Sequence, residues 1–128
     1  MSLALQFTRD EHLTKSEQNQ VFASSIDTSS PAGIAWVITI KFYAALHIVQ
    51  AYFVSRTGKA PTMHANRATA IERDMSISGA YDDYRELQDI SRSARYDCSD
   101  LQLGHLKFAD ECFASIKSIV GIHLPRHN

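Results

Sequence analysis

Residues 31–56 read PAGIAWVITIKFYAALHIVQAYFVSR and form the longest apolar segment of the 128-residue chain. The apolar residues do not alternate, and the run is far longer than an ordinary β-strand, so it predicts a long buried α-helix. Ser30 can cap the first turn of this helix, and Pro31 suits the first helical position, where a missing N–H costs nothing. Gly58 is expected to end it.

The predicted central helix is not apolar on every side. At 100° per residue, one narrow stripe collects Thr39, Tyr43, His47 and Gln50. Lys41 falls on nearly the opposite side. Polar side chains of a buried helix need partners, which leaves two interpretations: a hydrogen-bonded network inside the core, or one wall of a binding site.

The composition is that of an ordinary folded domain, with 45% hydrophobic and 21% charged residues. A chain of this length can bury about two thirds of its unfolded surface, so we expect a single domain, 1–128. The formal net charge of -1 means that any nucleic-acid binding would need a local basic patch. Cys98 and Cys112 lack zinc-ligand spacing, which favours reduced thiols in a cytoplasmic protein without metal or cofactor.

A membrane-spanning helix is the alternative for the long apolar segment, because its length would cross a bilayer. Lys41, His47 and Gln50 would each be costly at bilayer depth. The N-terminal residues MSLALQFTRDEH show no charged leader before an apolar run and no cleavage site. We therefore expect a soluble protein with no membrane partner.

Two further helices are predicted before residue 76. The first covers residues 9–26, with Thr8 and Glu11 as a capping box, and its sparse apolar residues place it on the outside of the bundle. Those apolar residues are Leu13, Val21, Phe22 and Ile26. The second is short, covers residues 64–75, and carries His64 and Arg67 on one face. Such a pair can grip a phosphate or carboxylate, or can simply decorate the surface.

A helix predicted at residues 80–97 separates its residue types by face. Its packing face consists of Tyr84, Leu87, Ser91 and Ala94. The neighbouring basic stripe consists of Tyr81, Arg85, Gln88, Arg92 and Arg95. Pairing of Asp89 with Arg85 or Arg92 on a wet surface is the plain interpretation. The clustering of Arg92, Arg95 and Tyr96 at the end of a helix that borders the core favours a binding site instead.

The closing helix is predicted to run to residue 120 or 122, with Ser99 or Asp100 as its cap. Its apolar residues recur at helical spacing and comprise Leu103, Leu106, Ala109, Phe113, Ile116 and Val120. Together these segments predict an all-α protein, an antiparallel up-and-down bundle of four to five helices. The core would span roughly 31–122, with 1–30 contributing a peripheral helix.

Three short segments carry a resemblance to a known family. FYAALHIVQAYF at 42–53, HANR at 64–67 and SRSARYD at 91–97, in this order, resemble the HEPN domains, which are small helical bundles. The resemblance covers roughly residues 31–120. It implies a frequent homodimer whose second and fourth long helices line a cleft. Many such domains are metal-free ribonucleases, often toxins neutralised by a nucleotidyltransferase-like partner, and others only bind nucleotides or RNA.

The nuclease members of that family carry an Arg and a His with four to six residues between them. Arg92 matches the Arg by position, but Asp-Cys-Ser at 97–99 stands where the His is expected. Metal-free RNA cleavage needs an acid, a base and a cation to hold the phosphate. Only a histidine from elsewhere, His47 or His64, could supply proton transfer.

Three hypotheses for the function follow. The first is a domain that binds the phosphates of a nucleotide or RNA, in a toxin–antitoxin or defence system. Its ligand-binding residues would be Arg92, Arg95, Tyr96, His64, Arg67, Tyr43 and Tyr84. The second is a divergent metal-free endoribonuclease with Arg92 as phosphate clamp and His47 as acid or base. The third is a non-catalytic helical interaction protein. The missing histidine favours binding over catalysis.

Overall fold

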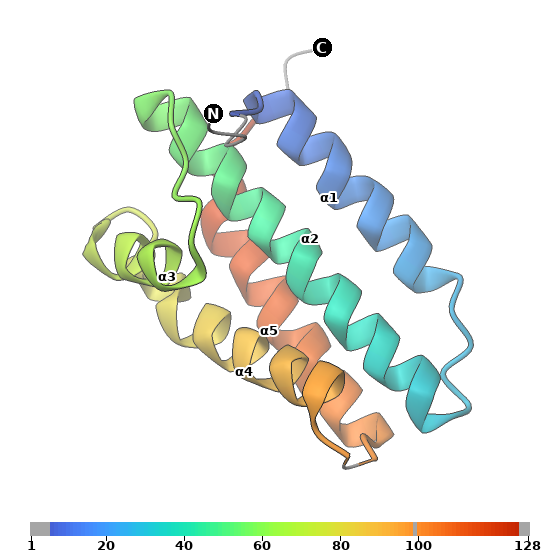
Figure 1. Ribbon diagram of the computed structural model, residues 1–128. Coiled ribbons are helices and arrows are strands. Elements are labelled where there is room, and N and C mark those ends of the chain that lie inside the picture. The colour runs from blue at the N-terminus through green and yellow to red at the C-terminus, as the bar shows by residue number, and fades with distance from the viewer. Residues whose placement is uncertain (1–5, 99, 126–128) are drawn as a thin grey trace, which may run out of the picture.

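The computed structural model describes residues 6–98 and 100–125, apart from the side chain of His64. This part of the chain is all-helical, as predicted, with a short 3₁₀ turn, η1, at Ser78–Ala80. The helices are α1 Arg9–Ser24, α2 Pro31–Thr57, α3 His64–Arg73, α4 Tyr81–Tyr96 and α5 Leu103–Gly121. The four long helices α1, α2, α4 and α5 alternate in direction along the chain, whereas α3 is short and set to one side (Figure 1).

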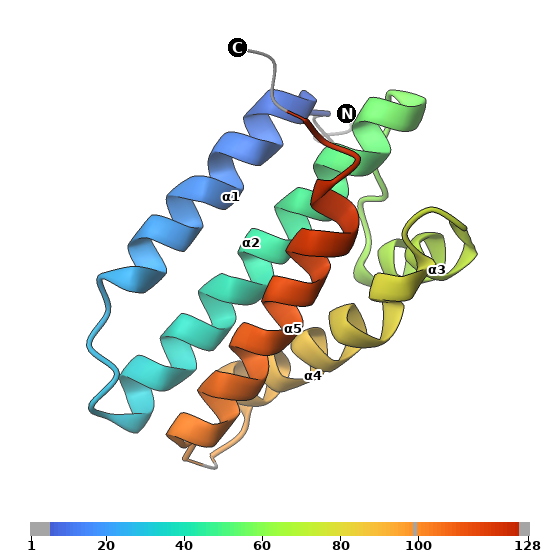
Figure 2. The same cartoon turned by 180° about the vertical axis from the view of Figure 1, so that it is seen from behind.

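Helix α2 is the centre of the fold and contacts α1, α4 and α5. Seen from behind, α1 and α5 both lie along α2, and α4 passes beneath α5 (Figure 2). The predicted ends of α2 are confirmed. The Ser30 hydroxyl accepts a hydrogen bond from the Gly33 N–H at 3.2 Å, and Gly58 ends the helix in the left-handed conformation at φ 78°.

The length and apolar character of α2 would also suit a membrane span. Its most apolar window has a mean hydropathy of 1.7, and 61% of that window is buried inside the protein. Such burial is typical of the core helix of a bundle, which passes the same test of length and composition. The neighbouring helices therefore supply the apolar environment that this segment needs.

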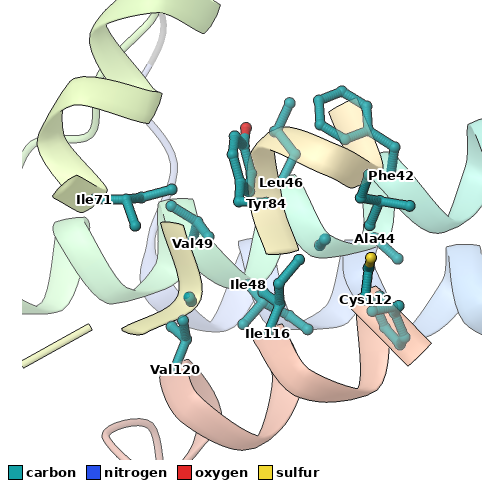
Figure 3. Packing of buried hydrophobic residues seen from close by; sticks show 14 of the residues in the cluster. Phe42, Ala44, Leu46, Ile48, Val49, Ile71, Tyr84, Cys112, Ile116 and Val120 are labelled. Carbon is teal, nitrogen blue, oxygen red and sulfur yellow. The ribbon is translucent and has the colours of Figure 1, made fainter. Parts of the chain in front are cut away.

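The core fills the space between α2, α4 and α5, with α3 closing one end (Figure 3). Its completely buried side chains come from all four of these helices and include Phe42 and Val49 of α2, Ile71 of α3, Tyr84 of α4 and Ile116 of α5. Burying one large apolar side chain contributes about 1.5–3 kcal/mol. The predicted packing face of α4 is confirmed, since Tyr84, Leu87 and Ser91 are completely buried.

Helix α1 packs against α2, but of the predicted apolar residues within it only Leu13 packs against the core. Val21 and Phe22 are 70% and 60% exposed. The buried residues are instead His12, Ser16 and Ala23, which share one side of the helix. Small and polar side chains allow α1 to lie close to α2, where the Ser16 hydroxyl donates a hydrogen bond to the Ala44 carbonyl at 2.8 Å.

Some helix ends differ from the predicted ones. Helix α3 ends at Arg73 because the Asp74 carboxylate accepts hydrogen bonds from the Ser76 N–H and the Tyr52 hydroxyl. The cap of α5 is Gln102 rather than Asp100, and the His105 ring completes it by accepting from the Gln102 N–H at 2.9 Å. Ser99, the other predicted cap, lies outside the described residues.

Candidate ligand-binding cleft

A cleft of about 570 Å³ lies between α3 and α4, where Tyr43 of α2 also reaches it. This volume is within the range of small-molecule binding sites. The lining residues are Tyr43, Ala65, Ala68, Thr69, Arg85, Gln88, Asp89, Arg92, Arg95 and Tyr96. The α3 residues are small, so the longer α4 side chains provide the polar groups. A second hollow of about 500 Å³ continues past Arg92 and Tyr96 to Asp97.

Arg95 is held firmly in the cleft. One guanidinium nitrogen donates a hydrogen bond to the Ser91 hydroxyl at 2.8 Å. The guanidinium carbon lies 5.5 Å from the ring centre of Tyr96, 5.7 Å from that of Tyr43 and 6.0 Å from that of Phe42. These are cation–π distances, and they fix the charge without neutralising it. Arg95 therefore presents a positioned positive charge between two aromatic rings.

Arg92 lies one helical turn before Tyr96 and is exposed. Within residues 6–98 and 100–125, its side chain makes no hydrogen bond or ion pair. The surface pairs of Asp89 with Arg85 or Arg92 are likewise not formed in this part of the chain. The Arg85 guanidinium donates to the Tyr81 hydroxyl at 3.1 Å. The donors of Arg92 are thus directed at solvent or at a ligand.

The charge of the cleft is positive. Its lining contains three guanidinium groups, from Arg85, Arg92 and Arg95, and a single carboxylate, from Asp89. Arginine donors in this number suit phosphate or carboxylate, which accept two parallel hydrogen bonds from one guanidinium. The exposed Tyr96 and half-exposed Tyr43 offer ring faces to a planar ligand group.

The structure brings together four of the residues that the sequence proposes for ligand binding: Tyr43, Arg92, Arg95 and Tyr96. It does not bring the others with them. Tyr84 faces the core, where burial raises the pKa of its hydroxyl and the nearby Arg67 charge opposes that rise. The side chain of His64 lies outside the described part of the chain.

Arg67 is a core residue, only 4% exposed, and does not line the cleft. Its Nε donates a hydrogen bond to the Gln50 Oε1 at 3.2 Å, and one terminal nitrogen donates to the Pro61 carbonyl at 3.4 Å. The Gln50 Nε2 donates to the same carbonyl at 2.7 Å. Arg67 and Gln50 therefore tie α3 and the preceding loop to α2.

His47 does not line the cleft either, since its ring meets His12 of α1, with 3.0 Å between the two Nδ1 atoms. The polar stripe of α2 is consequently divided. Tyr43 serves the cleft, His47 meets α1, Gln50 meets α3, and the Thr39 hydroxyl donates to the Ala35 carbonyl within its own helix. The interpretation as a hydrogen-bonded network is confirmed for Thr39, His47 and Gln50, and the binding-site interpretation stays a prediction for Tyr43.

Sequence reasoning placed Arg85 and Gln88 on the basic stripe but did not assign them to the site, and it missed Asp89 and Thr69. The signal for the α4 residues was present. Positions 85, 88, 89 and 92 fall on one side of a helix, so any cleft that takes Arg92 takes its neighbours as well. Whether Thr69 lines the cleft depends on how α3 packs beside α4, and the sequence of α3 alone does not indicate this packing.

One group of side chains in the described residues has donors suited to a metal ion. The carboxylates of Asp83 and Glu86 and the thiol of Cys112 lie within 4.8 Å of one another, across α4 and α5. The Ser115 hydroxyl donates to Asp83 at 2.6 Å. Burial and the two carboxylates raise the pKa of the Cys112 thiol to about 12, so a metal ion would have to displace a tightly held proton.

Comparisons of the chain with protein-family models, with curated proteins and with solved structures found no match. Another hollow, of about 400 Å³, lies between α1 and α5, but its lysine, Lys117, already donates a hydrogen bond to Gln20. The arginine-lined cleft is the stronger candidate site.

Proposed function

We propose that the protein binds the phosphates of a nucleotide or RNA in the cleft between α3 and α4. The observation that carries the proposal is the juxtaposition of the exposed Arg92 with Arg95, whose charge is positioned among aromatic rings. A phosphate is the ligand that best uses two neighbouring guanidinium groups. In this proposal Arg92 grips the phosphate and Arg95 provides a second, fixed positive charge.

Tyr43 and Tyr96 are proposed to contact the base. Their ring centres lie 5.7 Å and 5.5 Å from the Arg95 guanidinium, so a bound phosphate would have aromatic surface beside it. Stacking on such rings accepts any base, at about 1–3 kcal/mol per base. The proposal is thus a phosphate-directed site with little sequence preference. A small basic cleft of this kind is compatible with the overall charge of -1.

The nuclease alternative receives no support from the cleft. Cleavage without metal needs proton transfer at the 2′-hydroxyl and the leaving oxygen. Among the described side chains, no histidine lines the cleft, and His47 is engaged with His12. The resemblance to HEPN domains adds a proposed setting: a homodimer in a toxin–antitoxin or defence system, with a nucleotidyltransferase-like partner, in the cytoplasm.

The test is a titration of a short, fluorescein-labelled single-stranded RNA with purified protein in excess EDTA, followed by anisotropy and then by gel. We expect a rise in anisotropy with no change in RNA length. The affinity should fall with salt, with a log–log slope of about -1.4 if two phosphates are contacted. Absence of binding at low salt, for both this RNA and ATP, would refute the proposal. Shortened RNA would instead support the nuclease alternative.

Replacing Asp89 with Asn is expected to strengthen RNA binding about threefold, because it removes the carboxylate from the cleft lining while keeping its size. The measurement is the same anisotropy titration. The matched control is Asp82→Asn, which makes the same change at an exposed position of α4 outside the cleft. Equal effects of the two substitutions would show that only the net charge of the protein matters.

A further inference from the structure

Helix α1 is attached to the bundle in an unusual way. Among the helices of the described chain it packs against α2 alone. Its buried residues are His12, Ser16 and Ala23, of which only the last is apolar. Two further hydrogen bonds hold it at the surface, from Lys117 to Gln20 and from Arg9 to the Pro125 carbonyl. The buried members of the apolar core come from outside α1, and of the α1 residues only the partly buried Leu13 packs against that core.

Besides the buried hydrogen bond from Ser16 to the Ala44 carbonyl, α1 and α2 share a part-buried contact between the imidazole rings of His12 and His47. The two Nδ1 atoms lie 3.0 Å apart, and the ring centres 5.3 Å apart. One Nδ1 must donate and the other must accept, so at least one ring has to be neutral. If both rings were protonated, two N–H groups and two positive charges would face each other at this distance. The docked position of α1 therefore excludes the doubly protonated pair.

The surroundings of the two rings also oppose protonation. The rings of His12 and Phe7 lie nearly perpendicular with their centres 6.0 Å apart, and His12 is 7% exposed. Burial lowers the pKa of both histidines, and that of His47 falls to about 4. The charged groups that act on the pair are Glu11 and Lys15 from α1 and Arg67 from α3. Only Glu11 favours the charged form, and it is already bound to the N-cap Thr8.

We propose that the His12–His47 pair is a proton-sensitive latch: in mildly acidic solution both rings become protonated, and α1 separates from α2 while the remaining helices stay folded. Figure 1 shows α1 and α4 on different sides of α2. The latch joins α1 to α2, whereas the cleft is lined by α3, α4 and Tyr43. The latch does not rest on the proposed function. Release of α1 would expose the face of α2 that α1 covers.

The direction of the pH effect follows from linkage. The released state binds more protons, because an unburied histidine has a pKa near 6.5, whereas the pKa of docked His47 is about 4. The contribution of the neutral His47 ring to docking of α1 is thus fully present above pH 6.5 and is lost as the pH falls toward 4. For His47 alone, the equilibrium constant for release should increase roughly twentyfold between pH 7 and pH 5.

The test is amide hydrogen exchange of the full chain at pH 7 and pH 5, expressed as protection relative to the unfolded peptide at each pH. We expect the protection of α1 to fall about twentyfold and that of α5 to stay unchanged. His12→Gln with His47→Gln should abolish this pH ratio even if α1 is then less protected at both pH values. His123→Gln, which removes an imidazole that packs on Tyr52 and not on the His12–His47 pair, should preserve it.

Three results would overturn the latch. The first is equal protection of α1 at the two pH values in the natural chain. The second is a parallel loss in α1 and α5, which would mean acid unfolding of the whole domain. The third is a pH ratio that persists in the doubly substituted chain, because another group would then be responsible. His47→Gln alone provides a second variant. It should remove most of the difference in α1 protection between pH 7 and pH 5.

Discussion

Replacing Arg92 and Arg95 together with alanine is expected to weaken RNA binding by about a hundredfold. Each guanidinium would lose charge-assisted hydrogen bonds to phosphate, which contribute about 1.5–3 kcal/mol. The Arg95 substitution also removes the cation that lies between the Tyr43 and Tyr96 rings. Arg92→Ala alone should cost at least about 1.5 kcal/mol, near tenfold, without lowering the melting temperature, because Arg92 is exposed.

The measurement is anisotropy with labelled RNA at one fixed, low salt concentration, since salt alone changes such affinities. The matched control is a chain with Arg56→Ala and Arg73→Ala, two exposed arginines outside the cleft. It has the same net charge as the test variant. If both double variants bind RNA equally well, the cleft is not the site, and the affinity comes from the charge of the whole surface.

The fold was predictable where local chemistry and burial agree. Ser30, Pro31 and Gly58 mark the ends of α2 by capping and backbone conformation, which act within a few residues. Helix α1 was harder to place because its packing face carries almost no hydrophobic signal. A buried Ser16 that donates to a carbonyl of another helix resembles any surface serine in the sequence. Its role exists only once the two helices lie side by side.

The candidate site was predictable to the extent that one helix defines it. Arg92, Arg95 and Tyr96 occur on consecutive turns of α4, and their spacing is enough to place them together. Arg67 was different. The same spacing puts it on one face with His64 and Ile71, but it does not say which face turns inward. The complete burial of Ile71 decides the matter, because Arg67 enters the core beside it.

Replacing Arg67 with alanine is therefore expected to lower the free energy of unfolding by about 3 kcal/mol and leave RNA affinity unchanged. The Gln50 Oε1 would lose its donor inside the core, and a cavity would remain where the side chain was. In a domain of this size the melting temperature should fall by about 10 °C.

Thermal unfolding and the anisotropy titration, done on the same preparation, distinguish a structural from a binding role for Arg67. Arg73→Ala is the control, because it removes an exposed arginine from the same helix and should change neither quantity. If the Arg67→Ala protein is folded, keeps its melting temperature and binds RNA more weakly, Arg67 contacts the ligand and has no structural role. Loss of stability with intact affinity would show that the buried guanidinium stabilises the packing of α3 on α2 and takes no part in ligand binding.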